Sequence, residues 1–154
     1  MKTAIILICT GLFLFGCASG KKTTATKNGV TSQTVSNATL VETHWKLTEL
    51  MGQPVITDAN NREMYISLKK EGNMVMGNDG CNSFRGTYTL QEAAFRISFS
   101  PLAATLMACV NMEKGKEFME VLGRIDNYAI LGNTLSLNKA RMAPLARFEA
   151  VTIK

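Results

Sequence analysis

Cysteine and histidine are the side chains of this sequence best suited to covalent or metal chemistry, and the chain has four cysteines and one histidine. Cys81 lies in Gly77–Tyr88, where three glycines, two asparagines and an aspartate predict a tight turn. Cys109 lies further along the chain, and His44 lies well before both cysteines. These three residues are too few to form a zinc site. We therefore predict no metal site and no cofactor, which leaves a disulfide or thiol chemistry for the cysteines.

The first residues of the chain have the features of an export signal. Lys2 precedes an apolar run that is too short to span a bilayer, and the run ends at the small residue Gly16 before Cys17. Residues 14–17, Leu-Phe-Gly-Cys, resemble the lipobox of bacterial lipoproteins, in which the cysteine is lipidated and the chain is cut before it. The resemblance implies a signal peptide over residues 1–16 and a lipid on Cys17. The alternative is ordinary secretion with cleavage at a nearby small residue.

The cysteines at positions 81 and 109 remain once the signal cysteine and the lipidated cysteine are set aside. An even number in an exported domain predicts one disulfide, Cys81–Cys109. The sharper alternative is a cysteine nucleophile paired with His44, which would make the protein a thiol or redox enzyme. Asp79 and Asn82 flank Cys81, and we expect them to hydrogen-bond the turn rather than to act as acid or base.

Composition divides the rest of the chain into a tether and a domain. Residues 17–39 are rich in Ser, Thr, Lys, Asn and Gly and lack the apolar surface needed to fold, so they predict a flexible tether. The domain is expected over residues 40–154, which hold 13 basic and 12 acidic residues, a net charge of +1. The overall charge of +5 therefore belongs mostly to the tether and signal. Because no basic face with interleaved aromatics is visible, we expect no nucleic-acid binding.

Alternating apolar and polar residues predict a mainly antiparallel sheet. Strands are expected at residues 43–50, 64–68, 74–76, 86–90, 95–99, 128–131, 134–137 and 145–151. One helix is expected, because Phe118, Val121, Leu122 and Ile125 form an apolar stripe on one helical face. Gly115 weakens that helix by about 1 kcal/mol, so it must pack on the sheet. The predicted fold class is α+β, mainly antiparallel β, with a partly closed (cracked) barrel-like sheet and one helix.

Three motifs of the predicted domain resemble the signature of a known family. They are Gly77–Asn82, Gly86–Tyr88 and Thr105–Cys109, and the likeness extends from Trp45 to Phe148. The residues that carry it, besides the two cysteines, are Gly77, Gly80, Asn82, Gly86, Tyr88 and Thr105. This signature is similar to that of the META domain family, the HslJ-like heat-inducible bacterial lipoproteins. The resemblance implies a small β-rich fold with one helix, an envelope location, a link to stress tolerance and no established enzymatic activity.

Taken together, these features predict a lipid-anchored, non-catalytic protein of the bacterial cell envelope. We expect an outer-membrane lipoprotein with its domain in the periplasm, a monomer with a binding or stress-maintenance role. Its expected partners are the membrane, through the lipid, and an envelope protein or a hydrophobic ligand. Besides the thiol enzyme, one alternative is a carrier of an acyl chain or small lipid in the barrel interior, lined by methionines such as Met64, Met74, Met76 and Met107.

Overall fold

The computed structural model describes residues 38–57, 62–110 and 112–151, which all belong to one compact unit. The predicted signal peptide, Cys17 and nearly all of the tether lie outside the described residues. The strands are β1 (His44–Leu50), β2 (Gln53–Pro54), β3 (Met64–Lys69), β4 (Met74–Asp79), β5 (Ser83–Gln91), β6 (Arg96–Phe99), β7 (Ala103–Ala104), β8 (Asn127–Leu131), β9 (Thr134–Asn138) and β10 (Ala146–Val151). The α-helix is α1 (Glu113–Leu122), and short 3-10 turns occupy Glu71–Asn73 and Glu92–Ala94. No helix in this part of the chain is long and apolar enough to cross a membrane.

All strand pairs are antiparallel, and together they form one curved sheet. The strand order is β6-β5-β4-β3-β1-β10-β9-β8, with β2 added to β1 and β7 added to β5. The two ends of this order approach each other, where Tyr128 N donates to Phe95 O at 3.0 Å and Ile97 N donates to Asp126 O at 3.3 Å. No strand ladder joins β6 to β8 in the described chain, so one seam stays unsealed. The predicted mainly antiparallel, cracked-barrel fold with one helix is confirmed.

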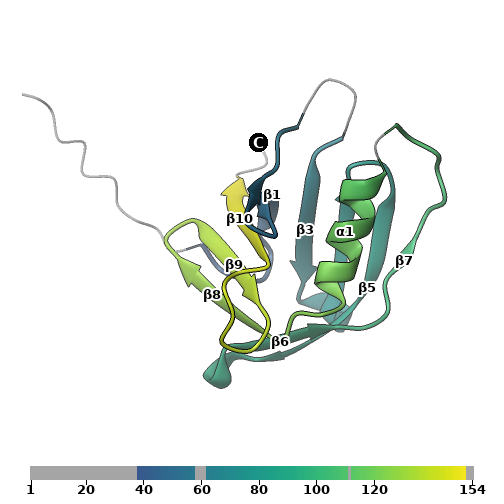
Figure 1. The fold of residues 1–154 in the computed structure, drawn as a ribbon. Helices are drawn as coiled ribbons and strands as arrows, with labels where there is room; N and C mark the ends of the chain where they lie inside the picture. The colour runs from purple at the N-terminus through teal and green to yellow at the C-terminus, as the bar shows by residue number, and fades with distance from the viewer. Residues whose placement is uncertain (1–37, 58–61, 111, 152–154) are drawn as a thin grey trace, which may run out of the picture. The chain divides into compact units, whose positions relative to one another are not determined.

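The helix packs on the concave side of the sheet and fills it (Figure 1). Phe118 is fully buried, with its ring 6.0 Å from that of Phe84 on β5 and 6.1 Å from that of Phe148 on β10. The predicted apolar stripe of Phe118, Val121, Leu122 and Ile125 is buried throughout. In the acyl-carrier alternative the ligand would lie in the barrel interior. The helix occupies this space instead. Burial of this stripe, at about 1.5–3 kcal/mol per large side chain, compensates for the weak local helix propensity.

Two details of the predicted sheet are wrong. Met74 and Met76 alternate with the buried Val75 on β4 and therefore lie on the opposite, outer face, so they do not line the interior. The strand predicted over residues 95–99 begins at Arg96, because Phe95 adopts a left-handed conformation at the end of a 3-10 turn and is exposed. Alternation along one strand indicates which residues share a face of the sheet. Which of the two faces is buried depends on the neighbouring strands.

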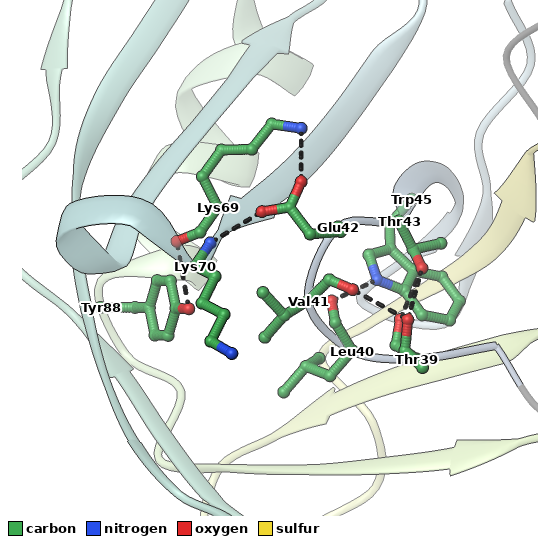
Figure 2. A network of polar contacts seen from close by, with 9 residues as sticks. All are labelled: Thr39, Leu40, Val41, Glu42, Thr43, Trp45, Lys69, Lys70 and Tyr88. Carbon is green, nitrogen blue, oxygen red and sulfur yellow. Dashed lines mark hydrogen bonds and ion pairs between the residues drawn. The ribbon is translucent and has the colours of Figure 1, made fainter.

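The domain begins slightly earlier than predicted, because Ala38 N already donates to Gly132 O at 3.1 Å. Figure 2 shows how residues 39–43 are fastened. Trp45 Nε1 donates to Leu40 O at 3.0 Å, and the Glu42 carboxylate accepts from Lys70 N at 2.8 Å and Lys69 Nζ at 3.0 Å. The residues just before β1 are therefore joined to the connection between β3 and β4.

The Glu42 contact predicts a loss of stability in acid. The bond from the Lys70 amide, then the Lys69 ammonium, hold the pKa of the Glu42 carboxyl below its ordinary value. A carboxylate with a lowered folded pKa stabilises the fold above the unfolded pKa of 4.5, and this contribution is lost as pH falls through the folded pKa. The urea midpoint of the wild type should fall between pH 6 and pH 3, and we expect Glu42→Gln to make this fall smaller. Denaturation curves recorded at intervals of about one pH unit measure it. Glu120→Gln on the exposed face of α1 is the charge-matched control, and an equal drop in both variants would contradict the assignment.

Candidate functional site

The predicted cysteine-containing turn connects β4 to β5 and is fixed by its own polar side chains. Asp79 Oδ1 accepts from Cys81 N at 2.9 Å and from Asn82 N at 2.6 Å, and Asn78 Oδ1 accepts from Gly80 N at 2.9 Å. Gly80 has φ +96, a conformation that favours glycine. Asp79 therefore holds the turn by hydrogen bonds, as predicted, but the second side chain that holds it is Asn78 and not Asn82.

The turn also holds the segment that follows β7. Cys81 is disulfide-bonded to Cys109, with 6.0 Å between their Cα atoms, as the sequence predicted. The buried Asn82 Oδ1 accepts from Thr105 Oγ1 at 2.9 Å and from Met107 N at 2.7 Å. Four of the motif residues, namely Asn82, Thr105 and the two cysteines, thus build one junction between the turn and this segment.

This junction predicts a cost for removing the Asn82 side chain. Asn82→Ala would leave the Thr105 hydroxyl and the Met107 amide without their buried acceptor. The two lost hydrogen bonds, at about 0.5–1.5 kcal/mol each, should lower the free energy of unfolding by about 1–3 kcal/mol. Thr105→Val removes just one of the two bonds and should cost less. Urea denaturation of both variants measures the difference, and equal effects would show that the amide bond to Met107 contributes nothing.

The remaining motif residues do not lie at the junction. Gly77 faces Tyr65 O and the Phe84 ring, and Gly86 faces Leu102 and Ser100, and in each case these neighbours occupy the space that a Cβ would need. Tyr88 is buried further along β5, where its hydroxyl donates to Lys69 O at 3.2 Å, and burial raises its pKa. Packing thus explains the two glycines, and the contact with Lys69 before the β3–β4 connection explains Tyr88 (Figure 2).

A pocket of about 420 Å³ lies beside the disulfide turn. Its walls are residues 54–57 after β2, the start of β3 with Arg62 and Met64, the turn at residues 79–82, and residues 110–116 apart from Asn111. Val55, Ile56, Met64, Val110 and Met112 supply apolar wall, and Arg62, Asp79, Glu113, Lys114 and Lys116 supply charge. Such a volume is in the range of small-molecule sites.

The pocket exists because of two long-range features. On the edge opposite β10, β1 pairs with β3 along its first half and with β2 at its end. The sheet is thereby split at this end, and the pocket lies between the two parts. On the other side, Gly115 lets α1 approach β4, since a Cβ there would lie 2.8 Å from Asp79 O. The glycine that the sequence suggested as a weakness is a close-packing position.

The structure does not bring His44 into this site. Its Nε2 lies 2.7 Å from Glu63 Oε1, its ring stacks on Tyr65 at 4.3 Å, and it is not among the residues that line the pocket. Partial burial alone would raise the pKa of Glu63, but hydrogen bonds to His44 and Lys46 hold that pKa below its ordinary value. Within residues 38–57, 62–110 and 112–151, no group of three His, Cys, Asp or Glu side chains is arranged to hold a metal ion. His44 is thus paired with Glu63, and Cys81 is bonded to Cys109. In this structure His44 is not paired with a cysteine, as the thiol-enzyme alternative requires.

The lining residues were mostly missed by sequence reasoning. Ile56, Arg62, Val110 and Lys116 come from three separate segments, and no local pattern connects them. The one available signal was the uncharged run of residues 97–112, which is long for a surface region.

Two solved structures resemble this fold. A protein from Burkholderia xenovorans, determined by NMR, matches with a TM-score of 0.58 at 22% identity over 74% of this chain and 85% of its own. A DUF4847 family protein from Bacteroides vulgatus matches with a TM-score of 0.49 at 13% identity over 72% and 92%. No curated protein matches the chain. The META domain family model matches residues 38–152, which include the disulfide turn and the pocket. The chain therefore belongs to the META domain family.

Proposed function

We propose that this protein is a lipid-anchored, non-catalytic binding module of the bacterial envelope, with its domain in the periplasm below the outer membrane. The observation that carries the binding role is the pocket beside the disulfide turn. The anchor rests on the lipobox-like residues before Cys17 and on the polar stretch that separates Cys17 from the domain. A stress-maintenance role accords with family membership.

The chemistry of the pocket supports binding rather than catalysis. Asp79 Oδ1 is engaged by the turn, Lys114 Nζ pairs with Glu117 at 3.1 Å, and the Cys81 sulfur is bonded to Cys109. The apolar wall offers burial for a hydrophobic group, which is the main source of affinity in such sites. Charged residues at the same pocket, such as Arg62 and Lys116, would orient the polar end of a ligand.

The anchor is tested by Cys17→Ala. A single acyl chain binds membranes marginally, and several chains bind lastingly, so we expect the variant to leave the membrane fraction or to stay uncleaved. Fractionation and the mass of the mature N-terminus measure this. The same membrane partition and the same N-terminal mass as wild type would refute lipidation.

The binding role is tested at the pocket. Val110→Arg places a charged side chain on the apolar wall. Leu131→Arg on β8 is the matched control, because Leu131 is also largely exposed and does not line the pocket. Native mass spectrometry of the intact lipoprotein isolated from envelopes should show a bound molecule that is retained in the control and lost in Val110→Arg. Identical spectra for all three proteins would refute a binding site here.

An acyl-chain carrier is a second candidate, because the pocket has an apolar wall and nearby cations. Its site would be this pocket at the end of the barrel, not the interior. Alkyl carboxylates of eight to sixteen carbons should then raise the melting temperature. A ligand at a concentration of 100 times its Kd stabilises the folded state by about 2.7 kcal/mol. No shift across the series would remove this candidate and leave the binding module itself standing.

A further inference from the structure

β7 and the residues that follow it are exposed and carry no charge. Residues 103–108, Ala-Ala-Thr-Leu-Met-Ala, are all exposed, and Leu106 is 99% exposed. They lie within a run of 16 residues, 97–112, that contains no Asp, Glu, Lys or Arg. We call residues 103–108 the arm. Exposed sheet edges are normally protected by charged residues or proline, and the arm has neither.

The arm contributes no side chain to the buried core, yet it is held at every second residue. Thr105 N donates to Ser83 O at 3.0 Å, Met107 N donates to Asn82 Oδ1 at 2.7 Å, and Cys109 just beyond is tied by the disulfide. An extended segment fixed in this way is already in one conformation. Binding of a partner is therefore not weakened by the entropic cost of ordering it.

The backbone groups between these attachments face away from the domain. In an antiparallel ladder the N–H and C=O groups of successive residues point to opposite sides. The backbone groups of Ala103 and Thr105 point toward β5. The N–H and C=O groups of Ala104 and Leu106 therefore point away from it. Among the described strands β7 pairs with β5 alone, so this edge has no neighbour there.

We propose that the arm binds an extended, uncharged segment of another envelope protein, which adds as a strand beside Ala104 and Leu106. Strand addition takes its affinity from main-chain hydrogen bonds and its specificity from alternate side chains. A segment without charges matches the arm, because a charged side chain would be desolvated there without a partner. This inference extends the proposed binding function to a protein partner on a different surface.

A second copy of this chain fits the arm less well. Two six-residue arms meeting about a twofold axis would bury much less than the roughly 1,200 Å² of a stable interface. Each arm also continues through Val110 into a pocket, so a second copy would place a concave surface against a concave surface. A flexible segment can pair with the arm and also reach into the pocket.

The test is site-specific photo-crosslinking of the full-length lipoprotein in intact cells. A photoreactive residue replaces Leu106 in one protein and Leu131 in a matched control, since both side chains are exposed in the described structure. We expect an adduct at position 106 to a different polypeptide, with the crosslinked peptide lying in an uncharged segment, at a yield about tenfold above position 131. Adding Ala104→Lys should reduce that yield about tenfold, equivalent to about 1.4 kcal/mol.

Each other outcome overturns the proposal. These are an adduct of twice the chain's own mass, an adduct to lipid alone, a yield equal to that at position 131, or a yield that Ala104→Lys leaves unchanged. An unchanged melting temperature in Ala104→Lys shows that the fold is intact. If Val110→Arg loses the pocket ligand and keeps the arm adduct, both the pocket site and the arm site stand. If the arm adduct is missing while the pocket ligand is retained, only the proposal for the arm is overturned.

Discussion

Gly77→Ala is expected to be among the most destabilising substitutions in the domain, with a loss of about 3 kcal/mol or more in the free energy of unfolding. A Cβ at this position would overlap Tyr65 O on β3 and the Phe84 ring on β5, where Phe84 Cε2 lies 2.9 Å away. Overpacking of a closely packed core costs about 1–3 kcal/mol, and more where backbone must move. Here both neighbours of β4 are affected, because Gly77 pairs with Ile66 and with Phe84.

Gly123→Ala is the matched control for this prediction. Gly123 has helical φ and ψ at the end of α1, and a Cβ there would meet its neighbours at 3.6 and 3.7 Å, an ordinary contact distance. Replacing it should be neutral or slightly stabilising, since alanine loses less entropy than glycine. Urea denaturation of both variants decides the matter, and a Gly77→Ala protein as stable as wild type would show that the sheet relaxes freely there.

The second large effect is expected from the disulfide. Cys81 and Cys109 are separated by 28 residues, and in the chain-entropy model closing a loop of this length stabilises by roughly 3.5 kcal/mol. The double variant Cys81→Ala/Cys109→Ala should therefore lose about 2–5 kcal/mol. The end of the arm should also be held less firmly, because the attachment at Cys109 would be lost while the bonds of Thr105 N to Ser83 O and of Met107 N to Asn82 Oδ1 remain.

Denaturation of the double variant and thiol counting on the wild type test the bond. Reduction of the wild type under denaturing conditions should shift its midpoint to that of the variant, which separates the effect of the bond from that of the substitutions. Two titratable thiols in protein purified under native conditions from the envelope, or an unchanged melting temperature in the variant, would refute a structural disulfide.

Much of the fold follows from local patterns in the sequence. The alternation around Trp45 and Leu47 gives β1 with both side chains buried, and the stripe of Phe118, Val121 and Leu122 gives the buried face of α1. The strand after the turn was predicted to begin at residue 86 but begins at Ser83, because pairing with β4 extends it. Periodicity locates elements well, while their ends depend on neighbouring strands.

The candidate site was predictable only at the turn. Cys81, Asn82 and Asp79 carry strong local signals, since glycine, asparagine and aspartate at this density form turns and two cysteines in an exported domain pair. The wall residues Ile56 and Val110 carry none, because a single exposed apolar side chain is ordinary on a protein surface. Their meaning comes from being neighbours in space.

Residue types and short-range spacing were enough to predict the helix, eight of the ten strands, the disulfide partners and the turn that holds them. The two-residue strands β2 and β7 were missed, because they form only by pairing with β1 and β5. The tertiary structure alone decided that the barrel interior is filled by α1, that Met74 and Met76 face outward, and that a pocket opens beside the turn. It also turned Gly115 from a weak helix position into the contact that brings α1 to Asp79. These outcomes depend on which surfaces meet across long separations in the chain, and burial free energy acts on surfaces in contact rather than on neighbours in sequence.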